Sequence, residues 1–116
     1  MTTLYGIPNC DTVRKARNWL GTRGIAHRFH DFRADGLTAE RVAAWVDALG
    51  WEALLNRRGT TWRQLDADVR AAIGAATAPA LLLAQPTLIR RPVLEQDGAV
   101  HLGFDADQYR LIFCAG

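Results

Sequence analysis

The first segment of the chain has the pattern of a strand, a turn with a cysteine, a helix and a second strand, and this order constrains the fold most. TTLYG (residues 2–6) mixes apolar and β-branched residues and predicts a strand. DTVRKARNWL (11–20) has apolar residues at helical spacing and is followed by the stop signals Gly21 and Gly24. AHRFHDF (26–32) predicts the second strand. A strand, helix and strand at this spacing predict a right-handed parallel crossover.

The middle of the chain has helical patterns. Thr38 is placed to cap a helix that ends at Gly50. Asp66 is placed to cap another helix through Ile73, and the alanine-rich segment after Thr77 predicts a further one. The middle segment is therefore expected to be helical, with a less regular stretch at WEALLNRRGTTWRQL (51–65).

The last third of the chain has the pattern of a hairpin followed by a helix. Asp97 and Gly98 lie between two short apolar runs and predict a two-residue hairpin turn, and Asp105 is placed to cap the final helix. The whole order predicts an α/β fold with a four-stranded mixed sheet. This order resembles the thioredoxin-like one, and we expect a single domain over residues 1–116 with a helical insertion at approximately 34–84.

Composition and spacing argue against several classes of function. Fourteen basic and twelve acidic residues give a net charge of only +2, which is too weak a bias to predict binding to nucleic acid or to a membrane. No segment approaches the ~20 apolar residues of a membrane span, so we expect a cytoplasmic protein. His27 and His30 are three residues apart on a predicted strand and face opposite ways, so no metal site is expected.

Cys10 stands directly before the first predicted helix, and its position favours reactivity. A thiol at a helix N-terminus meets unsatisfied backbone N–H groups and the positive end of the helix dipole, which both favour the thiolate. An isolated cysteine is most often a small buried apolar residue. Here the turn follows the carboxyl end of a strand, where α/β sheets place their ligands, and we therefore favour a reactive thiol. Cys114 lies in the last three residues and is expected to be a tail cysteine rather than a partner for Cys10.

Two arginine pairs are candidates for an anion site. Arg57 and Arg58 precede a glycine in an irregular segment, and Arg90 and Arg91 precede a proline just before a predicted strand. Each could be a solvated surface charge. Loops on the same side of the sheet as a reactive thiol can also present forked guanidinium donors to a carboxylate, a phosphate or a related oxyanion. We expect one arginine of each pair to bind an anion.

Three segments, in order along the chain, resemble the signatures of the arsenate reductase-like family, usually called ArsC/Spx. They are LYGIPNCDTVRKARNWL, GWEALLNRRGTTWRQL and QPTLIRRPVL. The resemblance covers essentially the whole chain and is closest to the branch called YffB, proposed to contain glutathione-dependent thiol reductases.

The resemblance implies roles for individual residues. Cys10 matches the nucleophilic cysteine of the family, and Arg91 matches the arginine that contacts the oxyanion next to a cis-proline. Arg58 occupies the position where the YffB branch has its own arginine. The remaining residues of the expected site, which support these three, are Asn9, Thr12 and Pro92.

Three departures from the family pattern bear on the reaction. The arsenate reductases have an arginine where this chain has Asn56, and another in the segment that here contains Phe104, so the resemblance does not favour arsenate as substrate. The regulatory Spx branch has a C-x-x-C pair at the first helix, whereas Val13 takes the second cysteine position here. A local disulfide switch is therefore not expected.

The resulting hypothesis is a glutathione- or glutaredoxin-dependent thiol-disulfide reductase with one nucleophile, Cys10. Arg58 and Arg91 are expected to bind the anionic part of a small anionic or thiol substrate. Glutathione is the expected co-substrate, no bound cofactor is expected, and glutathione or glutaredoxin is the expected partner. Two alternatives are arsenate reduction and a non-catalytic, Spx-like role in which the chain binds a protein partner and Cys10 is unused.

Overall fold

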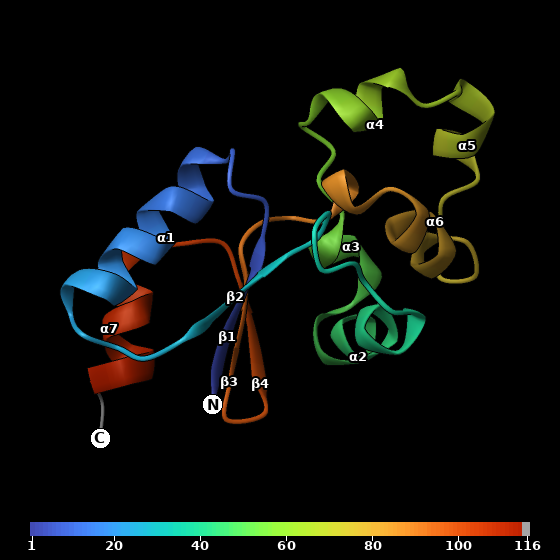
Figure 1. Ribbon diagram of the computed structural model, residues 1–116. Helices are drawn as coiled ribbons and strands as arrows, with labels where there is room; N and C mark the ends of the chain where they lie inside the picture. The colour runs from blue at the N-terminus through green and yellow to red at the C-terminus, as the bar shows by residue number, and fades with distance from the viewer. Residues whose placement is uncertain (115–116) are drawn as a thin grey trace. The chain divides into compact units, whose positions relative to one another are not determined.

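The computed structural model describes residues 1–114, and its centre is a mixed four-stranded sheet (Figure 1). The strands are β1 (Thr2–Gly6), β2 (Arg28–Asp31), β3 (Val93–Gln96) and β4 (Ala99–Leu102). Their order across the sheet is β2-β1-β3-β4. β1 pairs with β2 in parallel and with β3 in antiparallel orientation, and β3 pairs antiparallel with β4. This arrangement confirms the predicted α/β, thioredoxin-like fold.

The helix α1 (Asp11–Thr22) makes the crossover between the two parallel strands. It buries one apolar face, made by Val13, Ala16, Trp19 and Leu20. The helix continues through Gly21 and ends before Gly24, whose φ of 67° is a left-handed value that glycine adopts without steric cost. β2 is shorter than the predicted strand, and it begins at Arg28.

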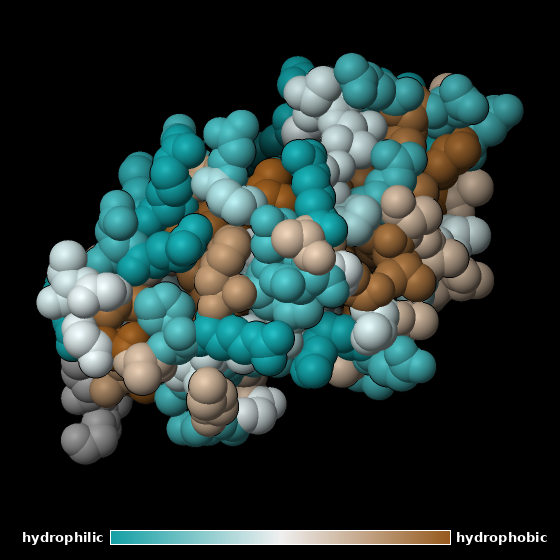
Figure 2. Space-filling model, viewed as in Figure 1, coloured by the Kyte–Doolittle hydropathy of each residue, from teal (hydrophilic) through white to brown (hydrophobic). Residues whose placement is uncertain are grey.

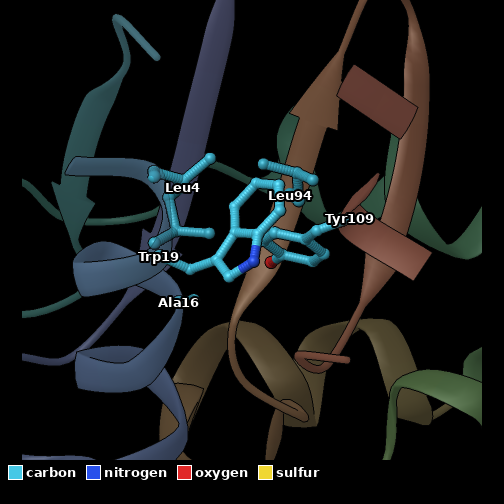
Figure 3. Packing of buried hydrophobic residues seen from close by; sticks show 6 residues of the cluster. Leu4, Ala16, Trp19, Leu94 and Tyr109 are labelled. Carbon is cyan, nitrogen blue, oxygen red and sulfur yellow. The ribbon is translucent and has the colours of Figure 1, made fainter. Parts of the chain in front are cut away.

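The core of this part of the chain lies between the sheet and the helices α1 and α7 (Ala106–Cys114). Both helices lie on the same face of the sheet (Figure 1). Trp19 of α1 packs edge-to-face on Tyr109 of α7, with 5.6 Å between ring centroids, and the two rings lie beside Leu4 and Leu94 of the central strands (Figure 3). These contacts fix α1 against the strands on which the candidate site is built. The side chain of Cys114, at the end of α7, lies outside the described part of the chain.

Residues 35–90 form a second compact unit, and residues 1–34 together with 91–116 form the first. The helices of the second unit are α2 (Ala39–Leu49), α3 (Trp51–Leu54), α4 (Thr60–Gln64), α5 (Ala67–Ala71), α6 (Ala78–Ala84) and the short 3-10 helix η1 (Pro86–Leu88). The core of this unit contains fully buried Val42 and Trp45 of α2 and Leu82 of α6, and these two helices pack on each other.

The capping predictions in this unit have different outcomes. Thr38 caps α2 as expected, because its hydroxyl accepts a 3.1 Å hydrogen bond from the backbone N–H of Arg41. The helix predicted after Asp66 is present, and Asp66 is its N-cap residue, but two details of the prediction are wrong. Its side chain makes no capping hydrogen bond, and α5 ends at Ala71. α5 buries none of its residues, so no packing holds further turns.

The predicted hairpin is confirmed. Asp97 and Gly98 connect β3 to β4 with positive φ angles of 50° and 83°, as a turn between tightly paired strands requires. Asp105 caps α7 through a 2.8 Å hydrogen bond from the backbone N–H of Asp107. Among residues 1–114, none of the helices has the length and apolar character that crossing a bilayer requires. The same residues contain no cluster of three or more His, Cys, Asp or Glu side chains able to hold a metal ion.

Candidate active site

Cys10 lies beyond the carboxyl end of β1, at the residue that precedes α1. Its φ of −138° and ψ of 125° are extended, and Asp11 begins the helix. β1 ends at Gly6, which lies close to Val13 in the first turn of α1. A Cβ at Gly6 would lie 2.7 Å from Cγ2 of Val13, closer than real Cβ atoms approach. The absence of a side chain at Gly6 therefore allows the first turn of α1 to lie directly against the end of the strand.

The environment of the Cys10 thiol favours its charged form. Burial raises the pKa of Cys10 and is the largest single influence, because it disfavours the thiolate. The backbone N–H groups of Val13 and Thr12 act in the opposite direction, and so does Arg91, both as a hydrogen-bond donor and as a positive charge. Together these donors outweigh burial, and the pKa of Cys10 lies below its ordinary value. The thiol is partly exposed and is within reach of a reagent.

The register of the sheet brings Arg91 to Cys10. Tyr5 and Val93 are Cα partners in the antiparallel pair of β1 and β3. The chain that enters β3 therefore lies at the edge of the sheet where β1 ends, and Arg91 is two residues before Val93. The peptide bond between Arg91 and Pro92 is cis.

Pro92 is buried and anchors this segment to the sheet. Its carbonyl accepts a 2.9 Å hydrogen bond from the N–H of Gly103, which follows β4. Arg91 itself is half-buried. The supporting position predicted for Pro92 thus corresponds to a residue that fixes the backbone beside Arg91.

The other two supporting residues lie on either side of Cys10. Thr12 is half-buried and contributes its backbone N–H to the thiol environment. Asn9 is exposed, and its Oδ1 accepts a long 3.5 Å hydrogen bond from Nη1 of Arg14. Arg14 also forms an ion pair with Asp11. Asn9 therefore contacts α1 through Arg14.

Arg57 and Arg58 belong to the helical unit and have different surroundings. The guanidinium of Arg57 lies 5.9 Å from the ring centroid of Trp51 and 5.8 Å from that of Trp62, which is the geometry of a cation–π contact with each ring. Both arginines are exposed, and the backbone N–H of Arg58 donates a 3.1 Å hydrogen bond to Oδ1 of Asn56. The aromatic contacts give Arg57 a packing role, and the choice of Arg58 for anion binding stays a prediction from the family resemblance.

Phe104 has a packing role. Its ring meets that of Tyr109 edge-to-face, with 4.9 Å between centroids, and it packs against the core of the first unit. Burial also raises the pKa of the Tyr109 hydroxyl far above its ordinary value, so Tyr109 stays protonated. An apolar ring at position 104 contributes no donor to an oxyanion.

Comparison with known proteins identifies the family. The family model of the ArsC family matches residues 5–112, nearly the whole chain. The chain belongs to the ArsC family. The solved structure of a protein named YffB has a TM-score of 0.92 and 45% identity, with 97% of this chain and 98% of that one covered. An arsenate reductase (ArsC) related protein from Brucella melitensis has a TM-score of 0.78 and 50% identity, with 97% and 93% covered.

A more distant relative is the global transcriptional regulator Spx of Streptococcus mutans, which is 26% identical over 113 residues. The alignment covers 95% of this ArsC-family chain and 81% of the regulator. In this chain the residue three positions after Cys10 is Val13, whose side chain is fully buried in the core. Position 13 therefore supplies packing and carries no second thiol for Cys10.

Proposed function

We propose that this ArsC-family chain is a monothiol oxidoreductase that reduces mixed disulfides of glutathione, with Cys10 as the nucleophile. The observation that carries the proposal is the lowered pKa of Cys10 beside the guanidinium of Arg91 and the first N–H groups of α1. A thiolate attacks disulfides and a thiol does not, so lowering the pKa increases the reactive fraction near neutral pH.

The reaction balances with a single protein thiol. In the first step the Cys10 thiolate attacks the glutathione sulfur of a mixed disulfide, a Cys10–glutathione disulfide forms, and the substrate leaves as a thiolate that takes up a proton. In the second step a glutathione thiolate attacks the glutathione sulfur bound to Cys10. Oxidised glutathione leaves and the Cys10 thiolate is regenerated. Each cycle reduces one substrate disulfide and oxidises one added glutathione.

An external thiol is the natural resolving group in this scheme. Val13 occupies the position that would hold the second cysteine of a C-x-x-C pair, and its side chain is buried. Glutathione, or a glutaredoxin that carries electrons from it, then supplies the second thiol. Arg91 binds the anionic part of the ligand next to Cys10, and Arg58 is assigned the same role from the family resemblance.

Glutathione-dependent reduction of a small glutathione mixed disulfide, coupled to glutathione reductase, tests the proposal. The protein carries Cys114→Ser so that only Cys10 reports. Turnover is expected in this background, and Cys10→Ser is expected to abolish it. Turnover that persists without Cys10 would remove this residue from the mechanism.

Two other outcomes would redirect the assignment. Oxidation of glutathione that depends on added arsenate, with no activity on mixed disulfides, would identify arsenate reduction as the reaction. RNA polymerase is the partner that the resemblance to the regulatory Spx branch implies. A Cys10 that reacts with neither disulfides nor alkylating reagents, in a protein that captures RNA polymerase subunits, would favour the partner-binding alternative.

A further inference from the structure

A polar hollow of about 360 Å³ opens on the flank of α1, outside the site described above. It is lined by Arg14, Arg17 and Asn18 of the helix and by His27 of the segment that leads into β2. Hydrophilic side chains cover the outer surface of α1 in the view of Figure 2. The lining contains two guanidinium groups and no carboxylate, so the hollow favours an anion.

The hollow lies on the same face of α1 as Cys10. Residues separated by four and seven positions share one face of an α-helix, and Arg14 and Arg17 have this spacing from Cys10. The N–H of Arg14 donates a 2.9 Å hydrogen bond to the carbonyl of Cys10, which ties the extended N-cap residue to the first turn of α1. At about 1.5 Å per residue, Arg17 is ~10 Å along the helix axis from Cys10.

The lining side chains are oriented by weak contacts that leave donors for a ligand. The guanidinium of Arg17 stacks over the ring of Phe29, 4.2 Å from its centroid, and such stacking leaves the edge N–H groups open. Arg14 pairs with Asp11, but both side chains are largely exposed, and an exposed pair of this kind exchanges readily with another carboxylate. Nδ1 of His27 lies 2.9 Å from the carbonyl of Ile25. A carbonyl only accepts, so Nδ1 donates this bond, and in the neutral ring Nε2 can accept a hydrogen bond from an N–H group of a ligand, while the two guanidinium groups supply the donors for its carboxylates.

We propose that this hollow binds the carboxylates of a small acidic thiol, such as a tripeptide, while its sulfur is bonded to Cys10. This inference rests on the proposed function and deepens it, because it assigns the specificity for the acidic thiol to the flank of α1. An extended tripeptide spans at most ~10 Å, so its carboxylates lie within that distance of its backbone at the thiol-bearing residue, and the long side chains of Arg14 and Arg17 extend from positions ~6 and ~10 Å along the helix from Cys10. In this arrangement Arg91 acts on the sulfur of Cys10, and Arg14 and Arg17 bind the carboxylates of the acidic thiol.

The assignment is tested with two disulfide reagents, by measuring the rate at which Cys10 forms a mixed disulfide with each. In the Cys114→Ser background, oxidised glutathione carries carboxylates and 2-hydroxyethyl disulfide carries none. Arg17→Ala is expected to lower the rate with oxidised glutathione by about two- to fivefold, the range for one exposed charge contact, and Arg14→Ala with Arg17→Ala to lower it further. The rate with the neutral disulfide is expected to stay within about twofold in both variants.

Lys15→Ala is the matched control. Lys15 is exposed on the same helix and removes the same charge on substitution, but it does not line the hollow. Its ratio of the two rates is expected to match that of the parent protein. A drop in Lys15→Ala as large as in Arg17→Ala, or an unchanged ratio in the arginine variants, would overturn the assignment.

A binding measurement separates this inference from the proposed function. S-methylglutathione cannot form a disulfide, and we expect it to shift the backbone amide NMR signals of Arg17 and His27. Such shifts in a protein whose Cys10 is inert toward both disulfides would support ligand binding in the hollow and would contradict the reductase proposal. Reaction at Cys10 without these shifts would support the reductase proposal and overturn the proposal that the hollow binds the acidic thiol.

Discussion

The guanidinium of Arg91 acts on the thiol of Cys10 both as a hydrogen-bond donor and as a positive charge. The two residues are far apart in sequence, and the antiparallel pairing of Tyr5 with Val93 brings them to one edge of the sheet. This relationship makes the reactivity of Cys10 depend on the sheet as well as on the helix. It can be tested separately from any substrate.

Arg91→Ala is expected to raise the pKa of Cys10, because it removes one donor and one positive charge and leaves burial in place. The rate of alkylation by iodoacetamide against pH, in a Cys114→Ser background, measures this pKa. The midpoint should move to higher pH, and the limiting rate of the fully ionised thiol with this neutral reagent should stay within about twofold. An unchanged midpoint would show that the N–H groups of α1 are sufficient without Arg91.

Gly6→Ala is expected to lower the free energy of unfolding by about 1–3 kcal/mol, the usual cost of overpacking a core. The added methyl group would meet Cγ2 of Val13 at 2.7 Å, and Val13 is fully buried. The displaced first turn should also raise the pKa of Cys10, because the N–H of Val13 is one of its donors. Urea unfolding and the alkylation profile measure the two effects.

Val13→Ala provides the control for this contact. Alone it should destabilise the protein by leaving a cavity, but in the presence of Gly6→Ala it removes the atoms that clash. The double variant should therefore be more stable than the sum of the two single effects predicts. Strict additivity would mean that the two residues do not compete for the same space.

Local patterns in the sequence predicted most of the elements of the fold. The turn at Asp97 and Gly98 and the cap at Thr38 depend on residues adjacent in sequence, and both are present as expected. The end of α5 was predicted wrongly, because Asp66 and Ile73 carry helix signals that no buried contact reinforces. Helix ends in segments without a buried face depend on packing that local patterns do not contain.

The candidate site was predictable to a different extent for each residue. The setting of Cys10 at a helix N-terminus follows from adjacent residues alone. The choice of Arg91 over Arg90 required the family resemblance, because the pairing of β1 with β3 is a long-range property. The hollow on α1 was missed, although the spacing of Arg14 and Arg17 from Cys10 was visible, because His27 comes from the chain beyond the helix.

Arg58→Ala and Arg57→Ala are expected to separate anion binding from packing. Arg57 contacts the rings of Trp51 and Trp62, so its loss should lower the free energy of unfolding by about 0.5–1 kcal/mol without changing the preference between charged and neutral disulfides. Arg58 is exposed, and its loss should reduce turnover of an anionic disulfide and change stability by less than about 0.5 kcal/mol. The reverse pattern would transfer the anion-binding role to Arg57. Urea unfolding and steady-state kinetics of the two variants make this comparison.

The lowered pKa of Cys10 also predicts how stability varies with pH. The unfolded thiol titrates at about pH 8.5. The pKa of the folded thiol lies below its ordinary value. Between the two pKa values the unfolded chain binds more protons at this site, so the free energy of unfolding rises with pH. The contribution is complete above the unfolded pKa and is lost as the pH falls through the folded pKa.

The comparison of Cys10 with Cys10→Ser, both in the Cys114→Ser background, isolates this contribution because serine does not titrate in this range. The difference in the free energy of unfolding between the two proteins should grow in favour of Cys10 as the pH rises between the two pKa values, and only there. Urea unfolding at a series of pH values measures the difference, and Arg91→Ala should narrow the window. An advantage that instead shrinks as the pH rises would mean that burial outweighs the donors around Cys10 and that the thiol is not activated.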